Sequence, residues 1–140
     1  MADLDLTDPA SFDFFHVENV RFSDTDMVGH VNNVSHVALV ESGRIAFSFE
    51  LAEGAGVSPG RITFVRLDID FRADLYYPGQ VRVCARVIAI GTTSFTLGIG
   101  VFFGQTCVTT SRNVMVQLDE EGRPSPLPDA FRRALADSMG

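Results

Sequence analysis

The sequence of 140 residues has little of what marks secreted, metal-stapled or membrane-spanning proteins. Its two cysteines, Cys84 and Cys107, form no CxxC pair and have no histidine close by, which argues against a disulfide framework or a zinc ribbon. We expect two reduced thiols in strands. No run approaches the roughly 18 apolar residues of a membrane span, and the acidic start MADLDLTDPASFDFF lacks the pattern of a secretory signal. A soluble cytoplasmic protein is therefore expected.

Positive charge is also scarce. The chain has 11 Lys and Arg residues against 18 Asp and Glu residues, a formal net charge of -7, and no basic stripe. Binding to nucleic acid or to an anionic membrane surface is therefore disfavoured. With 46% hydrophobic and 21% charged residues the composition is that of a folded globular protein. We expect a single domain over residues 1–140, with its core at about 14–118 and a C-terminal helical tail at about 128–139.

The hydrophobic periodicity changes along the chain. Residues 14–22 alternate approximately, which predicts a strand. From about 34 to 52 the apolar residues cover both sides of a helical wheel, which is typical of a buried helix. From 61 to 75 apolar residues alternate with Arg66, Asp68, Asp70 and Arg72, which predicts a strand whose wet face carries paired opposite charges.

Three further β-rich runs cover residues 80–90, 93–103 and 106–118. They are divided by Pro78-Gly79, Gly91-Thr92 and Gly104-Gln105, and such short turns predict antiparallel hairpins. The order predicts an α+β fold in which a long antiparallel sheet wraps a central buried helix. After a proline-rich break, Asp129 is expected to cap a short helix. The open sheet edges favour dimerisation through an edge.

The segment from Asp24 to Asn33 concentrates polar groups ahead of the predicted helix, with two carboxylates, an imidazole and two amides. The first amides of a helix lack intrahelical acceptors and lie at the positive end of its dipole, which suits a developing oxyanion. Asp26, seven residues before Asn33, could face that point as a base or a nucleophile. Aspartate and asparagine are equally favoured as helix caps and turn formers, so a capped loop without chemistry is the alternative.

A metal site is a weaker interpretation of the same segment. Asp24, Asp26 and His30 could supply oxygen and nitrogen ligands. No HxxxH motif and no cysteine pair accompanies them. We therefore expect neither a metal nor a cofactor.

Two further polar residues lie in the predicted helix. Glu41 is one helical step from Ala38 and Ile45, so its carboxylate is expected to be partly desolvated and to take part in catalysis. A structural ion pair between Glu41 and Arg44 is the alternative. His36, one turn after Asn32, could line the same site.

The stretch RFSDTDMVGHVNN, which covers residues 21–33, together with Glu41 and Arg44, resembles the hot dog fold acyl-CoA thioesterases, in particular the 4-hydroxybenzoyl-CoA thioesterase-like family. The resemblance continues through residues 72–75, 78–83 and 91–95, and covers about residues 14–118. It implies hydrolysis of an acyl-CoA-type thioester to a free acid and a thiol. The strand, helix and four-strand order predicted above is also the hot dog order.

The resemblance assigns roles by position. It implies that Asp26 acts on the thioester carbonyl as nucleophile or as general base, that the backbone amide near Asn33 holds the oxyanion, and that Glu41 assists from a facing subunit. Gly29 would let the backbone approach the thioester closely. The residues expected to bind substrate are Gly29, His30, Val31, Asn32, His36, Thr93 and Ser94.

One position departs from the family. Related enzymes often carry basic residues at the turn that here reads Gly91, Thr92 and Thr93, where they meet the CoA phosphates. An acyl carrier protein is therefore an alternative donor, although the net charge of -7 disfavours an acidic carrier. The resemblance further implies a homodimer or homotetramer with the site at a subunit interface.

Two rival functions remain open. One is a hot dog dehydratase or hydratase acting on a 3-hydroxyacyl or enoyl thioester, with His30 or His36 as the base. The other is a non-catalytic acyl-thioester binding module, in which Asp26 and the asparagine pair only cap the helix.

Overall fold

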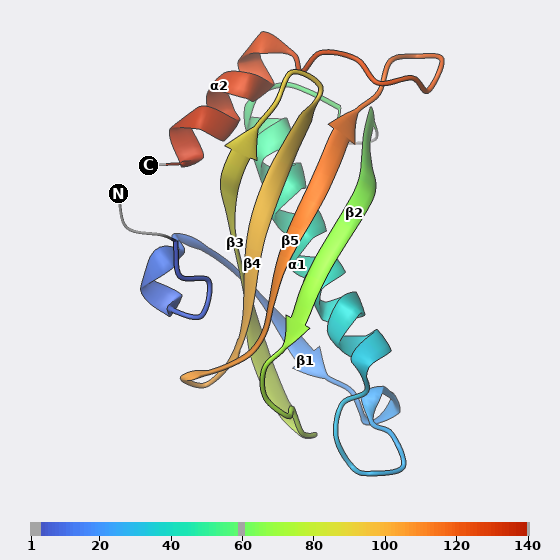
Figure 1. Ribbon diagram of the computed structural model, residues 1–140, viewed down its shortest axis with the longest axis vertical. Coiled ribbons are helices and arrows are strands. Elements are labelled where there is room, and N and C mark those ends of the chain that lie inside the picture. The colour runs from blue at the N-terminus through green and yellow to red at the C-terminus, as the bar shows by residue number, and fades with distance from the viewer. Residues whose placement is uncertain (1–3, 59–60, 140) are drawn as a thin grey trace.

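The computed structural model describes residues 4–58 and 61–139 (Figure 1). Pro59 and Gly60, which end the connection after the helix, lie outside the described residues, as do residues 1–3 and 140 at the ends of the expected domain. The principal elements in chain order are β1 (Phe14–Val20), α1 (Asn33–Gly54), β2 (Ile62–Phe71), β3 (Gly79–Ile90), β4 (Ser94–Phe103), β5 (Thr106–Gln117) and α2 (Asp129–Ser138). This order and these bounds agree with the periodicity of the sequence to within a few residues.

The strands form one antiparallel sheet in the order β1-β3-β4-β5-β2, and α1 packs along it (Figure 1). The hairpins β3–β4 and β4–β5 are as predicted. The hairpin expected at Pro78-Gly79 is wrong, because β2 pairs with β5 and β3 pairs with β1. The segment after β2 bonds instead to the loop before α1, where the Val31 amide donates to the Leu75 carbonyl at 2.7 Å. This bond draws the chain across the end of the sheet.

Close packing of α1 against the sheet depends on Gly43. A Cβ atom at this position would collide with the side chain of Val83 on β3. Helix α1 is not buried on every side within one chain, because Val34 is 79% exposed and Ile45 and Phe49 are each 43% exposed. One sheet covers one face of a helix, so the apolar residues on the opposite face need another surface to bury them.

The outer face of the sheet is polar on β2, as expected. Arg66 lies 3.3 Å from Asp68, and Arg72 lies 3.6 Å from Asp70, which confirms the predicted charge pairs. The N-terminal segment covers β4 on this sheet, since Cβ atoms at Gly98 and Gly100 would both meet Leu6.

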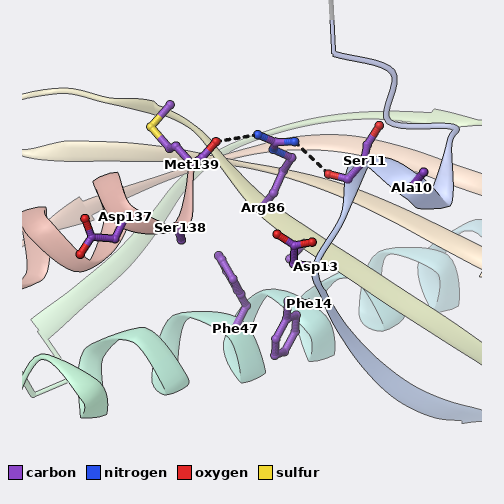
Figure 2. A pocket seen from close by; sticks show the side chains of 10 residues that line it. Ala10, Ser11, Asp13, Phe14, Phe47, Arg86, Asp137, Ser138 and Met139 are labelled. Atoms are coloured by element: carbon purple, nitrogen blue, oxygen red, sulfur yellow. Dashed lines mark hydrogen bonds between the residues drawn. The ribbon is translucent and has the colours of Figure 1, made fainter.

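Helix α2 packs at the far end of the sheet from the start of α1 (Figure 1). Its N-cap is Pro128, and Asp129 lies in the first turn, so the capping role predicted for Asp129 is wrong: an Asp inside the helix cannot use its side chain as the cap residue does. Arg86 joins the two ends of the chain by donating to the carbonyls of Ser11 and Met139, both at 2.9 Å (Figure 2). Both cysteines are free thiols in strands, as predicted.

Candidate active site

The loop before α1 is held by Asp24. Its buried carboxylate accepts hydrogen bonds from the backbone amide of Arg21 at 2.8 Å and from the Arg21 guanidinium at 2.9 Å. Its carbonyl accepts from the backbone amide and the side chain of Asn32, at 2.9 and 3.0 Å. Burial works against the charged form, but the bonds from Arg21 and Ser35 outweigh it and hold the pKa of Asp24 below its ordinary value. Asp24 is therefore a structural anion.

The same loop turns back on itself and presents Asp26. The Asp26 amide donates to the His30 carbonyl at 2.9 Å, and Thr25 forms a β-bridge with Val31. Gly29 has a φ of +95°, a conformation that favours glycine. Asn32 is the N-cap of α1 and accepts from the Ser35 amide at 2.9 Å. The side chain of Asn32 thus stabilises both the loop, through Asp24, and the start of α1, through Ser35.

A cavity of about 290 Å³ lies beside the start of α1. It brings together Asp26 and the helix N-terminus, which the sequence had placed seven residues apart. Its lining residues are Asp26, His30, Val31, Asn33, His36, Phe71, Arg72, Ala73 and Asp74.

The Asp26 side chain is exposed in this cavity. Its Oδ1 atom accepts a hydrogen bond from the Val28 amide at 2.9 Å, which orients the carboxylate. Asn33 is the first residue of α1, so its amide belongs to the turn whose N–H groups have no intrahelical acceptor. The cavity thus combines a negatively charged acceptor with the positive end of a helix of 22 residues.

His36 forms the floor of the cavity. Its Nδ1 atom lies 2.6 Å from the Thr109 hydroxyl, and its ring meets the edge of Phe71 with the centroids 5.5 Å apart. Burial lowers the pKa of His36, and the nearby Asp74 opposes this only in part. The imidazole is therefore neutral near pH 7. His30 lies at the rim, with its Nδ1 atom 3.8 Å from the carboxylate of Asp74.

Glu41 is not part of this cavity within one chain. Its side chain is 62% exposed, so the expected desolvation is wrong, because Glu41 lies on the outer side of α1 where one chain provides no cover. The alternative ion pair is confirmed, with Arg44 Nη2 3.3 Å from Glu41 Oε2. Glu41 lines a second cavity further along the helix.

Thr93 and Ser94 lie at the β3–β4 hairpin, at the opposite end of the sheet from the start of α1 (Figure 1). There Arg132 of α2 donates to the carbonyls of Gly91 and Thr92 at 2.8 and 3.0 Å. One chain therefore does not bring Thr93 or Ser94 near Asp26.

The sequence reasoning missed the wall formed by Phe71, Arg72, Ala73 and Asp74. These residues reach the cavity because Val31 bonds to Leu75 and His30 pairs with Tyr76. Both contacts join segments that lie more than 40 residues apart in the sequence, so no local pattern predicts them.

The structure groups no three His, Cys, Asp or Glu side chains that could hold a metal ion within residues 4–58 and 61–139. In the same ranges no helix is long and apolar enough to cross a membrane.

Comparisons with known proteins identify the family. Residues 20–135 match the family model described as the thioesterase-like superfamily. The chain belongs to this superfamily. It is 32% identical over 113 residues to the uncharacterized protein YsmA of Bacillus subtilis, covering 79% of this chain and 76% of that one. Superfamily membership supports thioester hydrolysis as the activity.

Solved structures agree with this assignment. A predicted thioesterase from Bacillus stearothermophilus superposes with a TM-score of 0.81 at 31% identity, covering 91% of this chain and 96% of that one. A thioesterase from Thermus thermophilus, solved with coenzyme A and Zn, gives a TM-score of 0.80 at 28% identity, covering 92% and 96%. The fold of this superfamily member is the hot dog fold, and the resemblance to hot dog thioesterases is confirmed.

Proposed function

We propose that this superfamily member hydrolyses an acyl-CoA thioester, with Asp26 as the catalytic carboxylate. The observation that carries the proposal is the cavity that sets Asp26 beside the N-terminus of α1. The coenzyme A in the Thermus thermophilus relative supports CoA as the thiol carrier. The net charge of -7 disfavours an acidic carrier protein as the donor.

The chemistry follows from the two polar groups. The thioester carbonyl oxygen would accept from the amide at Asn33, which stabilises the negative charge of the tetrahedral intermediate. Asp26 either attacks the carbonyl carbon directly or removes a proton from the water that does so. In both cases the carbon–sulfur bond breaks and the thiolate takes up a proton. Direct attack leaves an anhydride between Asp26 and the acyl group, which a water molecule then hydrolyses to release the acid and restore the carboxylate. When Asp26 acts as the base, the attacking water supplies the oxygen of the acid in one step.

Neighbouring residues shape the site. His36, neutral and fixed by Thr109, and Val31 would contact the bound thioester, while His30 at the rim would meet the pantetheine. Gly29 keeps the loop backbone open to the substrate, and Asn32 orders the oxyanion amide as the N-cap. These roles are binding and positioning roles.

A second copy of the chain completes the proposal. The outer face of α1 and the edge strand β2 expose Ile45, Phe49, Phe64 and Val65, which a homodimer would cover. In a dimer with the site at the subunit interface, Glu41, Thr93 and Ser94 would reach the site only from the second copy. A tetramer built from two such dimers would keep the same interface.

Thiol release across short, medium, long-chain and aromatic acyl-CoAs tests the function. We expect turnover of at least one class, and its loss in Asp26→Asn, which keeps the size of the side chain and removes its charge. The same acyl groups on a carrier protein should react more slowly. Absence of thiol release from every donor would overturn the proposal.

A further inference from the structure

The proposed reaction leaves one proton without a donor. When the carbon–sulfur bond breaks, the sulfur keeps both bonding electrons, and the thiolate then has to take up a proton. The amides of the helix N-terminus hold the oxyanion, and the ionised carboxylate of Asp26 has no proton to give. A third group beside the thioester is therefore needed if the protein itself supplies this proton.

Five residues that line the proposed catalytic cavity carry side chains that can be charged: Asp26, His30, His36, Arg72 and Asp74. Arg72 is excluded as the donor, because a guanidinium keeps its proton in proteins, and its Nε atom donates to Thr110 Oγ1 at 2.7 Å. His36 is excluded because burial lowers its pKa, and its Nδ1 atom lies 2.6 Å from the Thr109 hydroxyl. Within one chain the imidazole of His30 remains.

The loop before α1 fixes His30 relative to Asp26. The Asp26 amide donates to the His30 carbonyl at 2.9 Å, and the Gly29 amide donates to the Asp26 carbonyl at 3.1 Å. The two residues therefore belong to one hydrogen-bonded turn, and both line the same cavity. The sulfur of a thioester is bonded directly to the carbonyl carbon, so a group that protonates it has to share the cavity with Asp26.

The ring of His30 is held by two residues of the segment after β2. Asp74 Oδ1 lies 3.8 Å from His30 Nδ1, and the Tyr76 ring meets the His30 ring at 89° with the centroids 5.6 Å apart. The backbones of His30 and Tyr76 also form a β-bridge. The Tyr76 hydroxyl lies 3.5 Å from Asp74 Oδ2, so the carboxylate has one oxygen towards each ring.

The position of Asp74 determines which nitrogen of His30 is free. The carboxylate lies on the Nδ1 side of the imidazole, which leaves Nε2 as the nitrogen that can face a substrate. When both nitrogens carry a proton, His30 and Asp74 form an ion pair. Imidazole is also the side chain that most often transfers protons near neutral pH.

We propose that His30 donates the proton that the leaving thiolate takes up, and that Asp74 is the positioning residue for His30. This inference rests on the proposed function for the position of the thioester. As the carbon–sulfur bond breaks, its electron pair goes to the sulfur. The Nε2–H bond of the imidazolium breaks, and its proton passes to the sulfur, which leaves a thiol and a neutral imidazole. Solvent returns a proton to His30, and the proton removed from the attacking or hydrolysing water goes to solvent.

Two thioesters of one acyl group, one of CoA and one of nitrothiophenol, test this step. Nitrothiophenolate is a weaker base than the thiolate of CoA, so it leaves readily without a proton donor. We expect His30→Gln to lower kcat about 100-fold for the acyl-CoA and less than about threefold for the nitrothiophenyl ester. Measuring kcat at saturation separates this effect from a lost contact with the pantetheine, which raises KM alone.

Asp74→Asn keeps the size of the side chain and removes its charge. It should lower kcat about tenfold for the acyl-CoA, with little change for the nitrothiophenyl ester, a dependence on the leaving group that a merely structural role does not produce. His16→Gln is the matched control. His16 forms the other pair of a half-exposed histidine and a carboxylate, 2.8 Å from Glu18 on β1 and outside the cavity, so this variant should keep both rates.

The outcomes separate this inference from the proposed function. Asp26→Asn should lose turnover of both thioesters, because attack on the carbonyl is needed whatever the leaving group. If the wild type releases thiol from neither thioester, the proposed function fails and the inference fails with it. If the wild type is active and His30→Gln lowers both rates equally, raises only KM or changes neither rate, the inference alone is overturned.

Discussion

The loop before α1 and the second cavity further along α1 differ in how their polar groups are satisfied. Around Asp26 the loop is exposed, and its polar atoms are bonded, with Asp24 held by Arg21 and Asn32 capping the helix. Around Arg44 the cavity is apolar, and two buried polar atoms lack partners among the residues that the structure describes. Hydrogen bonds to every named polar group hold the loop in one geometry, which a catalytic site requires. Buried polar atoms without a partner lower the free energy of unfolding until a hydrogen-bond partner binds to them. The contrast supports the proposal that the reaction takes place at the loop that carries Asp26.

A change that moves the whole helix should affect the loop and the second cavity together. In Gly43→Ala the new methyl group collides with Val83, so α1 must shift from the sheet. We expect a loss of about 3 kcal/mol of unfolding free energy, measured by urea denaturation, with reduced turnover. Gly54→Ala, where the added methyl group meets nothing within 4 Å, is the control on the same helix. Unchanged stability in Gly43→Ala would mean that the helix does not depend on this contact.

Asp24→Asn should act at the loop alone. It weakens the charge-assisted bonds from Arg21, so we expect a loss of about 2 kcal/mol of unfolding free energy in the same denaturation measurement. Asp26→Asn is the matched control, since Asp26 is exposed and its carboxylate accepts from Val28. If both variants are equally stable, Asp24 does not hold the loop.

The pH dependence of stability should report His36. Its pKa is lower in the folded protein than the ordinary value of 6.5, because burial disfavours the imidazolium. As the pH falls, the unfolded chain therefore takes up the proton before the folded protein does. The contribution of neutral His36 to the free energy of unfolding is fully present above pH 6.5 and is lost as the pH falls through the lower pKa of the folded state. In His36→Gln thermal unfolding should not show this loss as the pH falls below 6.5. An identical pH profile in both proteins would contradict the burial of a neutral imidazole.

The smallest effect is expected at the second cavity, which Ser48 lines. Ser48→Ala removes a buried hydroxyl that has no partner among the described residues, so the unfolding free energy should stay within about 0.5 kcal/mol or rise slightly. A loss of more than about 1 kcal/mol in denaturant unfolding would show that the hydroxyl is already satisfied in the free protein.

How far the sequence predicts this molecule depends on the range of the contacts. Alternation along β2 and the polar segment before α1 are local patterns, and they predicted the strands, the helix and the place of Asp26. The pairing of β2 with β5, and the wall from Phe71 to Asp74, depend on contacts such as Val31 to Leu75 that no short pattern contains. Glu41 shows a limit of the same reasoning on a helix. Its apolar neighbours in the sequence predicted burial, but they do not show which face of α1 the sheet covers and which face stays exposed in one chain.

The most direct test of the central claim measures kcat and the Kd for the acyl-CoA side by side in the wild type and in Asp26→Asn. If Asp26 carries out the reaction, kcat should fall at least about 100-fold while the Kd changes by no more than a few fold. A folded Asp26→Asn protein that retains its turnover would contradict the account.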